Sequence, residues 1–539
     1  MPKERYALIS VYDKTGIVEF ATHLEIAGYT VIATGNTYNT LKSAGITDLK
    51  RIDEITNFPE IMDGRVKTLH PAIFGGILSI RDNENHIKDM KKNNINPIDF
   101  VVVNLYPFKE MKDKNITFEE KLEFIDIGGV SLIRAAAKNF GHVSVVISPA
   151  YYSAIIEFLK NKQEISKEIK KVFAYEAFKL TADYDNEISK FLGSEEEKRD
   201  ESFKGELNLN LKKISHLRYG ENPHQKAAFY KAGFNEDLNE DLNEIITHEQ
   251  KTDNYPAFKK ISGKDISYNN LLDIDSTLNI IKDFYETEDW FSLIVKHTNP
   301  CGAALSKISL KDAFLKARKT DEISSYGGII AFNKKVNKET ALEIKPFFVE
   351  IILAPGYSDD ALEILKSKKN TIIIEYFHNF ILKRDKFSLR SASGGVLIQE
   401  KDDVQDNTHS FKTVTNKKID DHLLNDLIFA WKIAKHVKSN AIVYAKDCAT
   451  IGIGAGQMSR IDSAKFAYQK MNDSYGNVKG FVMASDGFFP FKDSVEYAGK
   501  IGVSGIIEPG GSIRDNEVIK EADKLNIPMI FTNIRHFKH

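Results

Sequence analysis

The chain has 539 residues, of which 42% are hydrophobic and 11% are aromatic, a composition typical of ordered globular domains rather than of disordered chains. Because this length exceeds what one hydrophobic core usually serves, we expect two to four domains. The 74 lysine and arginine residues nearly balance the 76 aspartate and glutamate residues, and the net charge of −2 excludes a general electrostatic attraction to nucleic acid.

The chain contains two cysteines, Cys301 and Cys448, which excludes a disulfide scaffold and any zinc site built from several cysteines. The first ten residues lack the apolar segment of a signal peptide, and no apolar run approaches the ~18–20 residues of a membrane span. We therefore expect a cytoplasmic protein that binds neither membranes nor nucleic acid.

Apolar, β-branched runs alternate with helical patterns over the first 150 residues, and this order predicts a parallel sheet covered by helices on both faces. Ligands of such sheets bind at the carboxyl ends of the strands. The expected strands are 6–11, 29–34, 100–106 and 143–148, and the expected helices include 17–27 and 130–139.

Two loops of this region place hydroxyl and glycine residues between a strand and a helix: SVYDKTG, at 10–16, and TGNT, at 34–37. Amides at a helix N-terminus bind phosphate, although ordinary N-capping explains either loop by itself. Two such loops at neighbouring strand ends favour a phosphate pocket. Its candidate residues are Ser10, Lys14, Thr15, Thr34, Gly35 and Thr37.

Three further segments bring ionisable residues close to glycines or strand ends: DGRVKTLHPAIFGG (63–76), NLYPF (104–108) and IDIGGVSLIRAAAKN (125–139). The first is also explained as a solvated basic loop. The Gly128 and Gly129 amides are candidates for binding an oxyanion. The candidate proton carriers are Lys67, Tyr106, Asp126 and Lys138.

A charged run, GSEEEKRDES at 193–202, predicts a domain boundary, which we place between 198 and 199. The polar segment 235–244 is expected to be a loop insertion. Strand and helix patterns resume at 213, and the remaining ~325 residues predict two similar subdomains. The expected strands are 291–295, 328–332, 350–354, 441–445, 480–484, 505–508 and 529–532.

The segment LIVKHTNPCGAALS, at 293–306, ends an apolar strand with Lys296 and His297. The pair is either a surface accident, half of a metal site or an acid–base pair. Neighbouring residues of a strand point to opposite faces, so both side chains reach one ligand only beyond the strand end, at the turn that Pro300 predicts. A zinc deaminase site would need two further cysteines in C-x-x-C spacing, and only Cys448 remains beside Cys301.

A glycine-rich segment, GIGAGQMSR at 452–460, has the spacing G-x-G-x-G rather than the G-x-G-x-x-G of dinucleotide-binding loops. The residues from 441 to 454 therefore predict a hairpin that leads into a glycine-rich loop. Arg460 precedes a helical pattern and is a candidate phosphate contact. Asn440 precedes a buried strand, where its amide is placed to bind a carboxamide.

Several of these motifs resemble a known family. RVKTLHP, NLYPF and DIGGVSLIRAAAKN are similar to the signature segments of the inosine monophosphate cyclohydrolase domain, and LRYGENPHQ (217–225) to the start of the formyltransferase joined to it in a bifunctional family of purine biosynthesis. SYGGIIAFN, FVEIILAPGY, SDGFFPFKD, PGGSIRDNEVI and RHFKH continue the resemblance in order over essentially the whole chain. Asn36 departs from it where a second glycine is common, and Glu350 where some members carry Asp.

The resemblance implies an α/β fold, with a methylglyoxal-synthase-like domain over 1–198 and a transformylase region of two cytidine-deaminase-like subdomains over 199–539. It also implies two reactions. A formyl group moves from 10-formyltetrahydrofolate to the amine of 5-aminoimidazole-4-carboxamide ribonucleotide, and the product closes to inosine monophosphate with loss of water.

The weak amine nucleophile of the first reaction needs a base, and the tetrahedral oxyanion needs positive charge. We expect His297 to move the proton and Lys296 to stabilise the oxyanion or act as an acid, with Asn440 orienting the carboxamide. In ring closure, Lys67 and the amides of Gly128 and Gly129 would hold charge, while Tyr106, Asp126 and Lys138 would move protons. The remaining expected substrate contacts are Arg65, Arg218, Tyr219, His224, Tyr326, Gly327, Glu350, Arg460, Phe488, Asp493 and Arg535.

The family further implies that 10-formyltetrahydrofolate is a co-substrate, that no metal is required, and that the chain forms a homodimer; a structural monovalent cation stays open. The partners expected from it are small nucleotide and folate molecules. A non-enzymatic alternative treats residues 1–150 as an effector-binding module, and the phosphate loops fit that interpretation equally well. It does not account for the four proton carriers.

Overall fold

The computed structural model describes residues 4–108, 110, 114–193, 211–232, 254–379, 387–404 and 410–539. The chain forms two compact units: Met1–Leu211 with Ala232–Gln250, and Lys212–Lys231 with Lys251–His539. The expected boundary at 198/199 and the polar segment 235–244 lie outside the described residues, so the boundary stays a prediction.

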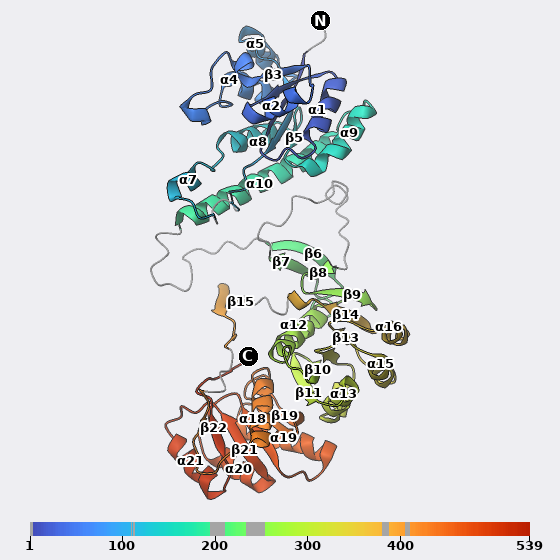
Figure 1. The fold of residues 1–539 in the computed structure, drawn as a ribbon, viewed down its shortest axis with the longest axis vertical. Coiled ribbons are helices and arrows are strands. Elements are labelled where there is room, and N and C mark those ends of the chain that lie inside the picture. The colour runs from blue at the N-terminus through green and yellow to red at the C-terminus, as the bar shows by residue number, and fades with distance from the viewer. Residues whose placement is uncertain are drawn as a thin grey trace. The chain divides into compact units, whose positions relative to one another are not determined.

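The first unit contains a five-stranded parallel sheet with the strand order β3-β2-β1-β4-β5 (Figure 1). The predicted parallel sheet is confirmed, and β3 is a strand that was not predicted. Ile9 pairs with Ala33 and Val11 with Asn104, so β2, β1 and β4 end side by side. The strands are β1 (Arg5–Val11), β2 (Tyr29–Ala33), β3 (Leu49–Arg51), β4 (Ile98–Asn104) and β5 (Ser144–Val146).

Helices cover both faces of this sheet, because the strand order reverses direction after β3 and right-handed crossovers then change face. One group contains α1 and α9, which pack together; the other contains α4, α8 and α10, in which α8 contacts both neighbours. The helices are α1 (Ile17–Ile26), α2 (Gly35–Ser43), α3 (Ile52–Thr56), α4 (Pro71–Leu78), α5 (Glu84–Lys92), α7 (Phe118–Leu122), α8 (Gly128–Lys138), α9 (Tyr152–Lys160) and α10 (Lys167–Gly193).

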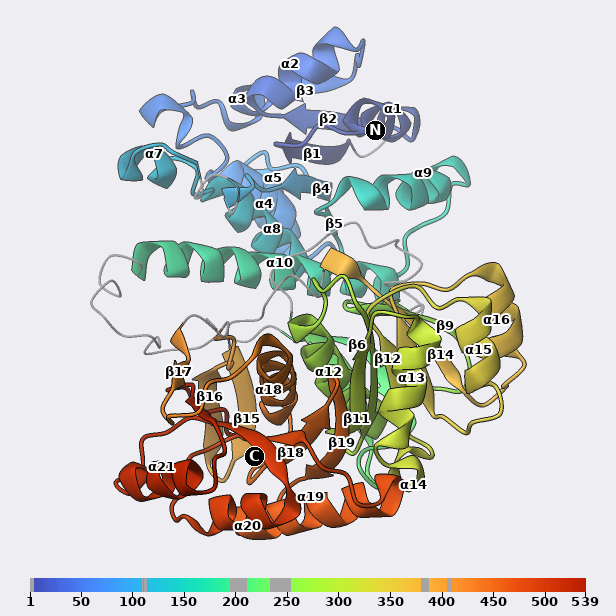
Figure 2. The same cartoon turned by 60° about the horizontal axis from the view of Figure 1, so that its bottom comes forward.

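The second unit is built on a thirteen-stranded mixed sheet (Figure 2). Two separate two-stranded sheets, β6–β7 and β15–β16, accompany it. The sheet strands are β8 (Asn254–Tyr255), β9 (Phe258–Ser262), β10 (Trp290–Lys296), β11 (Asn299–Ser306), β12 (Ile329–Phe332), β13 (Ile351–Ala354), β14 (Ile372–Tyr376), β17 (Lys412–Thr413), β18 (Ile442–Lys446), β19 (Ala449–Gly454), β20 (Phe481–Ser485), β21 (Val503–Glu508) and β22 (Met529–Phe531). The hairpins comprise β6 (Leu211–Leu217), β7 (Ala227–Ala232), β15 (Phe387–Ala392) and β16 (Gly395–Glu400).

The sheet of this unit is a tandem repeat of one strand order. From its centre outwards, one half has the order β11-β10-β12-β13-β14 and the other β19-β18-β20-β21-β22. Each half begins with a long helix and a hairpin. The helices are α12 (Tyr268–Asp283), α13 (Leu310–Lys319), α14 (Glu322–Ser325), α15 (Lys338–Ile344) and α16 (Asp359–Lys366) in the first half, and α18 (Asp421–Ala434), α19 (Arg460–Tyr475), α20 (Asp493–Ile501) and α21 (Asp515–Lys524) in the second.

A glycine at the fourth position of each central strand lets a helix approach closely. A Cβ atom on Gly302 would lie 2.0 Å from the Ala317 carbonyl oxygen of α13, and one on Gly452 would lie 2.3 Å from the Ala467 carbonyl oxygen of α19. The predicted hairpin over 441–454 is confirmed as β18 and β19. Gly452 therefore serves helix packing, which accounts for its presence without a dinucleotide.

The turn expected at Pro300 lies elsewhere. His297 and Thr298 form the turn between β10 and β11, whereas Pro300 is inside β11 and pairs with Val295. The register of this pair shifts between Ile294 and Val295. Such an irregular position tolerates a residue that has no backbone N–H to donate, which explains why the proline does not end the strand.

Among the helices of the described ranges, none has both the length and the apolar character needed to cross a bilayer.

We expect Gly302→Ala to destabilise the second unit by roughly 1–3 kcal/mol, because the added methyl group overlaps a backbone carbonyl that cannot turn away. Urea unfolding of the full chain measures the loss as a lower midpoint. Gly395→Ala is the matched control, since its Cβ atom meets nothing within 4 Å. Equal midpoints for the two variants would contradict the packing role of Gly302.

Candidate active sites

The two predicted phosphate loops meet at the carboxyl edge of the first unit's sheet. The Ser10 Oγ and Thr34 Oγ1 atoms are 3.0 Å apart, and the Thr37 hydroxyl donates to the Val11 carbonyl at 3.1 Å. Gly35 opens α2 with a φ of 40°. The structure therefore brings together the residues that the two loop motifs singled out.

The loop between β1 and α1 is held by a residue that the sequence did not single out, Asn104 at the end of β4. Its side-chain oxygen accepts hydrogen bonds from the amides of Tyr12, at 2.6 Å, and Asp13, at 2.9 Å. Asp13 in turn accepts from the Thr15 amide and hydroxyl, and these bonds lower its pKa. Lys14 donates to the Tyr12 carbonyl at 3.2 Å.

A cavity of about 260 Å³ opens beside the second loop. Lys67 Nζ lies 3.6 Å from Glu60 Oε1 at the wall of this cavity. The lining residues are Ala33, Gly35, Tyr38, Arg51, Ile52, Asp53, Pro59 and Glu60. The start of helix α2, the Tyr38 ring, the Arg51 guanidinium group and two carboxylates thus line a space of the size of a small ligand.

Asp126 lies at the start of α8, where its Oδ1 atom accepts the Gly129 amide at 2.7 Å and its own amide donates to the Tyr184 hydroxyl at 2.8 Å. A Cβ atom on Gly129 would lie 2.4 Å from Asp126 Oδ2, so glycine is required there. Burial raises the pKa of Asp126, and the Gly129 amide and Lys67 offset this only in part. The carboxyl group thus holds its proton to a higher pH than an exposed aspartate does, which favours a role in proton exchange.

The other candidates for ring closure are spread more widely. The Tyr106 ring is 40% exposed and lies 4.9 Å from the Tyr12 ring. Arg65 forms an ion pair with Glu123. Lys138 is exposed and ends the eleven-residue helix α8. It lies about 15 Å along the helix axis from Gly128, so the structure does not bring it to Asp126.

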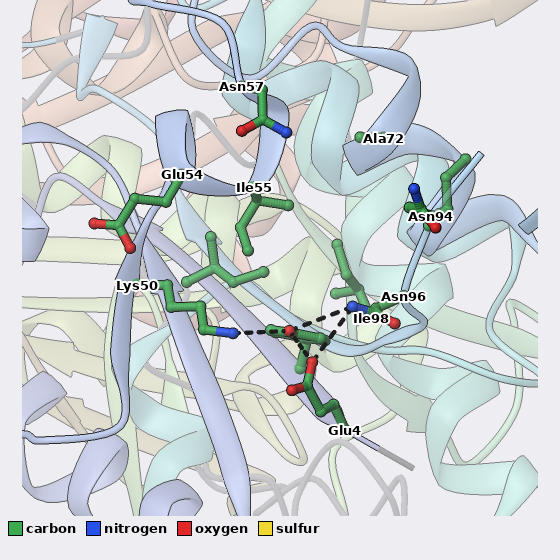
Figure 3. Close-up of a pocket in the computed structure, with 12 residues that line it drawn as sticks. Glu4, Lys50, Glu54, Ile55, Asn57, Ala72, Asn94, Asn96 and Ile98 are labelled. Carbon is green, nitrogen blue, oxygen red and sulfur yellow. Dashed lines mark hydrogen bonds between the residues drawn. The ribbon is translucent and has the colours of Figure 1, made fainter. Parts of the chain in front are cut away.

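A second hollow of the first unit, of about 270 Å³, lies at the starts of β1 and β4, away from the phosphate loops (Figure 3). Lys50, Asn96 and Glu4 converge there on the Tyr6 hydroxyl, to which Lys50 Nζ donates at 3.1 Å. The polar groups satisfy one another, and none of the predicted site residues lines this hollow.

In the second unit, Lys296 ends β10 and donates from Nζ to the Tyr326 carbonyl at 2.8 Å. His297 is exposed in the adjoining turn with a φ of 53°. Tyr326 is 58% exposed, and Gly327 next to it has a φ of 77°. Side chains alternate between the two faces of β10, but His297 lies beyond the end of this strand. Its side chain therefore need not point away from that of Lys296, and both lie at one end of the sheet.

Glu350 lies before β13, at the same end of the sheet, because β12 and β13 are parallel and adjacent. Its Oε1 atom is 2.5 Å from Lys264 Nζ and accepts from Asn270 at 3.5 Å. Arg218 is exposed and donates to the Tyr219 hydroxyl at 2.9 Å. His224 is exposed in the loop that follows.

The second repeat contributes Asn440 and Arg460. The side-chain amide of Asn440 donates to the carbonyls of Gln457 and Met458, at 2.9 and 3.2 Å. Arg460 donates to Asp486 at 3.0 Å and to the Phe488 carbonyl at 3.1 Å. Arg535 is exposed with its guanidinium group over the Phe537 ring, and Asp493 is exposed at the start of α20.

Two contacts join the repeats beside His297. The Lys438 amide donates to the Asn299 side chain at 2.9 Å, and Lys538 Nζ lies 3.4 Å from the Thr298 carbonyl oxygen. The sequence did not point to Asn299 or Lys538, nor to Asp273, which accepts the Thr298 amide. Asp273 lies in an ordinary helical pattern, so only its position in space reveals it.

Two family models match consecutive parts of the chain. The family model described as AICARFT/IMPCHase bienzyme matches residues 136–470, and the MGS-like domain model matches residues 16–131. The chain belongs to the AICARFT/IMPCHase family. It is a bifunctional enzyme of purine biosynthesis, an AICAR formyltransferase and an IMP cyclohydrolase, and the resemblance drawn from its motifs is confirmed.

Similar full-length relatives carry the name "Bifunctional purine biosynthesis protein PurH". The protein of Caldicellulosiruptor saccharolyticus is 46% identical over 538 residues, 99% of each chain. That of Persephonella marina is 44% identical over 535 residues, 99% of this chain and 100% of its own. That of Bacillus cereus is 44% identical over 537 residues, with the same coverage.

One buried carboxyl group of this AICARFT/IMPCHase member lies near Arg460. Glu508, at the end of β21, is fully buried, and its Oε2 atom accepts the Gly510 amide at 2.9 Å. Burial raises its pKa from 4.5 to about 8; Asp515 adds to the increase, while the Gly510 amide and Arg460 oppose it. The side chain is therefore neutral in the folded protein at pH 7.

The folded state keeps the Glu508 proton until about pH 8, whereas the unfolded chain releases it near pH 4.5. Stability linked to this group is therefore full below pH 4.5 and is lost as pH rises towards 8. We expect Glu508→Gln, which is neutral at every pH, to gain stability over the wild type at pH 8 relative to pH 5. Urea midpoints at both pH values measure this gain, with exposed Glu517→Gln as the control. A gain independent of pH would contradict the raised pKa.

Proposed function

We propose that formyl transfer takes place at the His297 turn and ring closure at the start of α8. The observation that carries the first assignment is that Lys296 and His297 leave β10 together at the end of the sheet where Tyr326 and Glu350 also lie. Asp126, with its raised pKa beside Lys67, supports the second assignment.

In formyl transfer, the amine of the ribonucleotide is conjugated with its ring and is a poor nucleophile. His297 removes a proton from it as the new C–N bond forms, and Lys296 stabilises the charge that develops on the formyl oxygen. The bond between the formyl carbon and the folate nitrogen then breaks, and the departing nitrogen takes up the proton that His297 removed. Asn440 and Glu350 orient the carboxamide. We assign the exposed Arg218 and Arg535 to the phosphate group, whereas Arg460, which is tied to Asp486, holds the surrounding loop.

His297→Ala should lower formyl transfer by about 10²-fold or more, because the reaction loses its proton carrier. Ring closure of the preformed formylated nucleotide should continue at the wild-type rate. Both rates are measured on the full chain, and exposed His422→Ala is the control. Formyl transfer at a near wild-type rate in His297→Ala would sink this assignment.

In ring closure, the carboxamide nitrogen attacks the formyl carbon and water leaves. An amide nitrogen is weakly nucleophilic, so orientation and charge stabilisation dominate. Lys67 holds the developing negative charge, Gly128 and Gly129 position Asp126, and Asp126 transfers the proton with Tyr106. Lys138 has no part in this step, because it lies at the far end of α8 from Asp126.

Asp126→Asn should lower the rate of ring closure by about 10²-fold, because the amide cannot exchange a proton. Formyl transfer should stay unchanged, since it occurs in the other unit. Exposed Asp89→Asn, on α5, serves as the control. An unchanged rate of ring closure in Asp126→Asn would remove this residue from the mechanism.

We further propose that 10-formyltetrahydrofolate is the formyl donor, that no metal is required, and that the enzyme is a cytoplasmic homodimer. Supplying the ribonucleotide and this folate to purified protein should yield inosine monophosphate. Formation of the formylated nucleotide without inosine monophosphate would instead favour the interpretation of residues 1–150 as an effector-binding module.

A further inference from the structure

The turn that carries His297 has an unusual backbone. His297 and Thr298 have φ angles of 53° and 62°, in the left-handed region. Histidine adopts this conformation more often than most residues, whereas a β-branched residue such as threonine rarely does. Two consecutive residues in this conformation form the tight turn between the antiparallel strands β10 and β11. Neither residue is a glycine, so surrounding contacts must stabilise the turn.

Helix α12 forms hydrogen bonds with both backbone polar groups of Thr298, the amide and the carbonyl. Asp273 Oδ1 accepts the Thr298 amide at 2.6 Å. One turn later on the same face, the Ser276 hydroxyl donates to the Thr298 carbonyl at 2.9 Å. Lys538 reaches the same carbonyl oxygen from the C-terminal segment, at 3.4 Å.

We propose that Asp273 is a positioning residue for formyl transfer, which holds the left-handed turn so that the His297 imidazole faces the substrate. This inference rests on the proposed role of His297. Asp273 acts through a backbone hydrogen bond, without touching the substrate, and nothing in the sequence around it marks the role. A rigid turn would keep the proton carrier in place between turnovers.

The second repeat contains the same device without a histidine. Asp426 is the sixth residue of α18, as Asp273 is of α12, and it accepts the amides of Asp447, at 2.9 Å, and Cys448, at 2.6 Å. Asp447 and Cys448 have φ angles of 53° and 52°. The clamp therefore belongs to the repeated fold, and only the first copy holds an imidazole at the turn.

The charges around the turn come from several elements. Burial raises the pKa of Asp273, and the Thr298 amide opposes this increase. Among the nearby charges, His297 lowers the pKa of Asp273 and Glu350 raises it. Lys296 precedes His297 on β10, Lys264 pairs with Glu350, and Lys538 approaches from the C-terminal segment. In the second repeat, exposed His422 lies 3.1 Å from Asp447 instead.

The repeat offers a matched pair of variants for the test, Asp273→Ala and Asp426→Ala in the full chain. Both should lower the urea midpoint, because each removes the acceptor of a clamped turn. Only Asp273→Ala should lower kcat for formyl transfer, by about tenfold or more, with the KM for the ribonucleotide within about threefold of the wild type. Asp273→Asn keeps an acceptor oxygen and should restore most of kcat.

A double variant shows whether Asp273 acts through His297. The residual rate of Asp273→Ala/His297→Ala should equal that of His297→Ala, because no imidazole is left to position. An equal fractional loss in both backgrounds would overturn the proposal, as would a wild-type kcat in Asp273→Ala or a matching loss of kcat in Asp426→Ala.

The role of His297 and the role of Asp273 are tested by different outcomes. A full formyl-transfer rate in His297→Ala would overturn the proposed function itself, whereas the outcomes above concern only the role of Asp273. If Asp273→Ala fails to fold, Asp273→Ser takes its place, since serine is too short to reach the Thr298 amide. A wild-type kcat in a folded Asp273→Ser variant would then overturn the proposal.

Discussion

The second unit depends on two carboxylates that hold left-handed turns. Asp273 and Asp426, at the same position of two equivalent helices, accept the amides of the hairpins that meet at the centre of the sheet. A turn of this kind without glycine requires such an acceptor. Because the clamp fixes where β10 ends, it also decides that Lys296 and His297 leave the strand together. One copy of the repeated hairpin thus carries Lys296 and His297, the residues that we propose for formyl transfer.

In the first unit, parallel strand pairing positions the candidate site residues. Parallel pairing aligns the carboxyl ends of β2, β1 and β4, so hydroxyl groups from two loops meet at one edge. Glycine at 129 lets α8 begin against Asp126, whose carboxyl group is buried enough to have a raised pKa. The same close packing that desolvates this carboxyl group also directs the Gly129 amide onto it. The packing of α8 and the proton transfer that we propose therefore involve the same carboxyl group.

Strand positions and the parallel sheet were predictable because apolar periodicity is local, whereas the two subdomains were expected from the length of the region and from the family resemblance. The turn at 297–298 was predicted at Pro300, two residues beyond its end, since a proline inside an irregular strand has the same local signature as a turn. Asn104 and Asp273 were missed because each acts on a distant segment, 92 and 25 residues away. Lys138 satisfied a motif, but the length of α8 separates it from Asp126.

The sequence by itself determined the elements, the family and therefore the two activities, because motif residues and hydrophobic patterns are written along the chain. Only the tertiary structure decided which polar side chains meet. Hydrogen bonds such as those from Thr298 to Asp273, or from Lys538 to Thr298, join residues that are far apart in the sequence, and no sequence motif links them. Burial likewise depends on all neighbours at once, so the raised pKa values of Asp126 and Glu508 follow from packing alone.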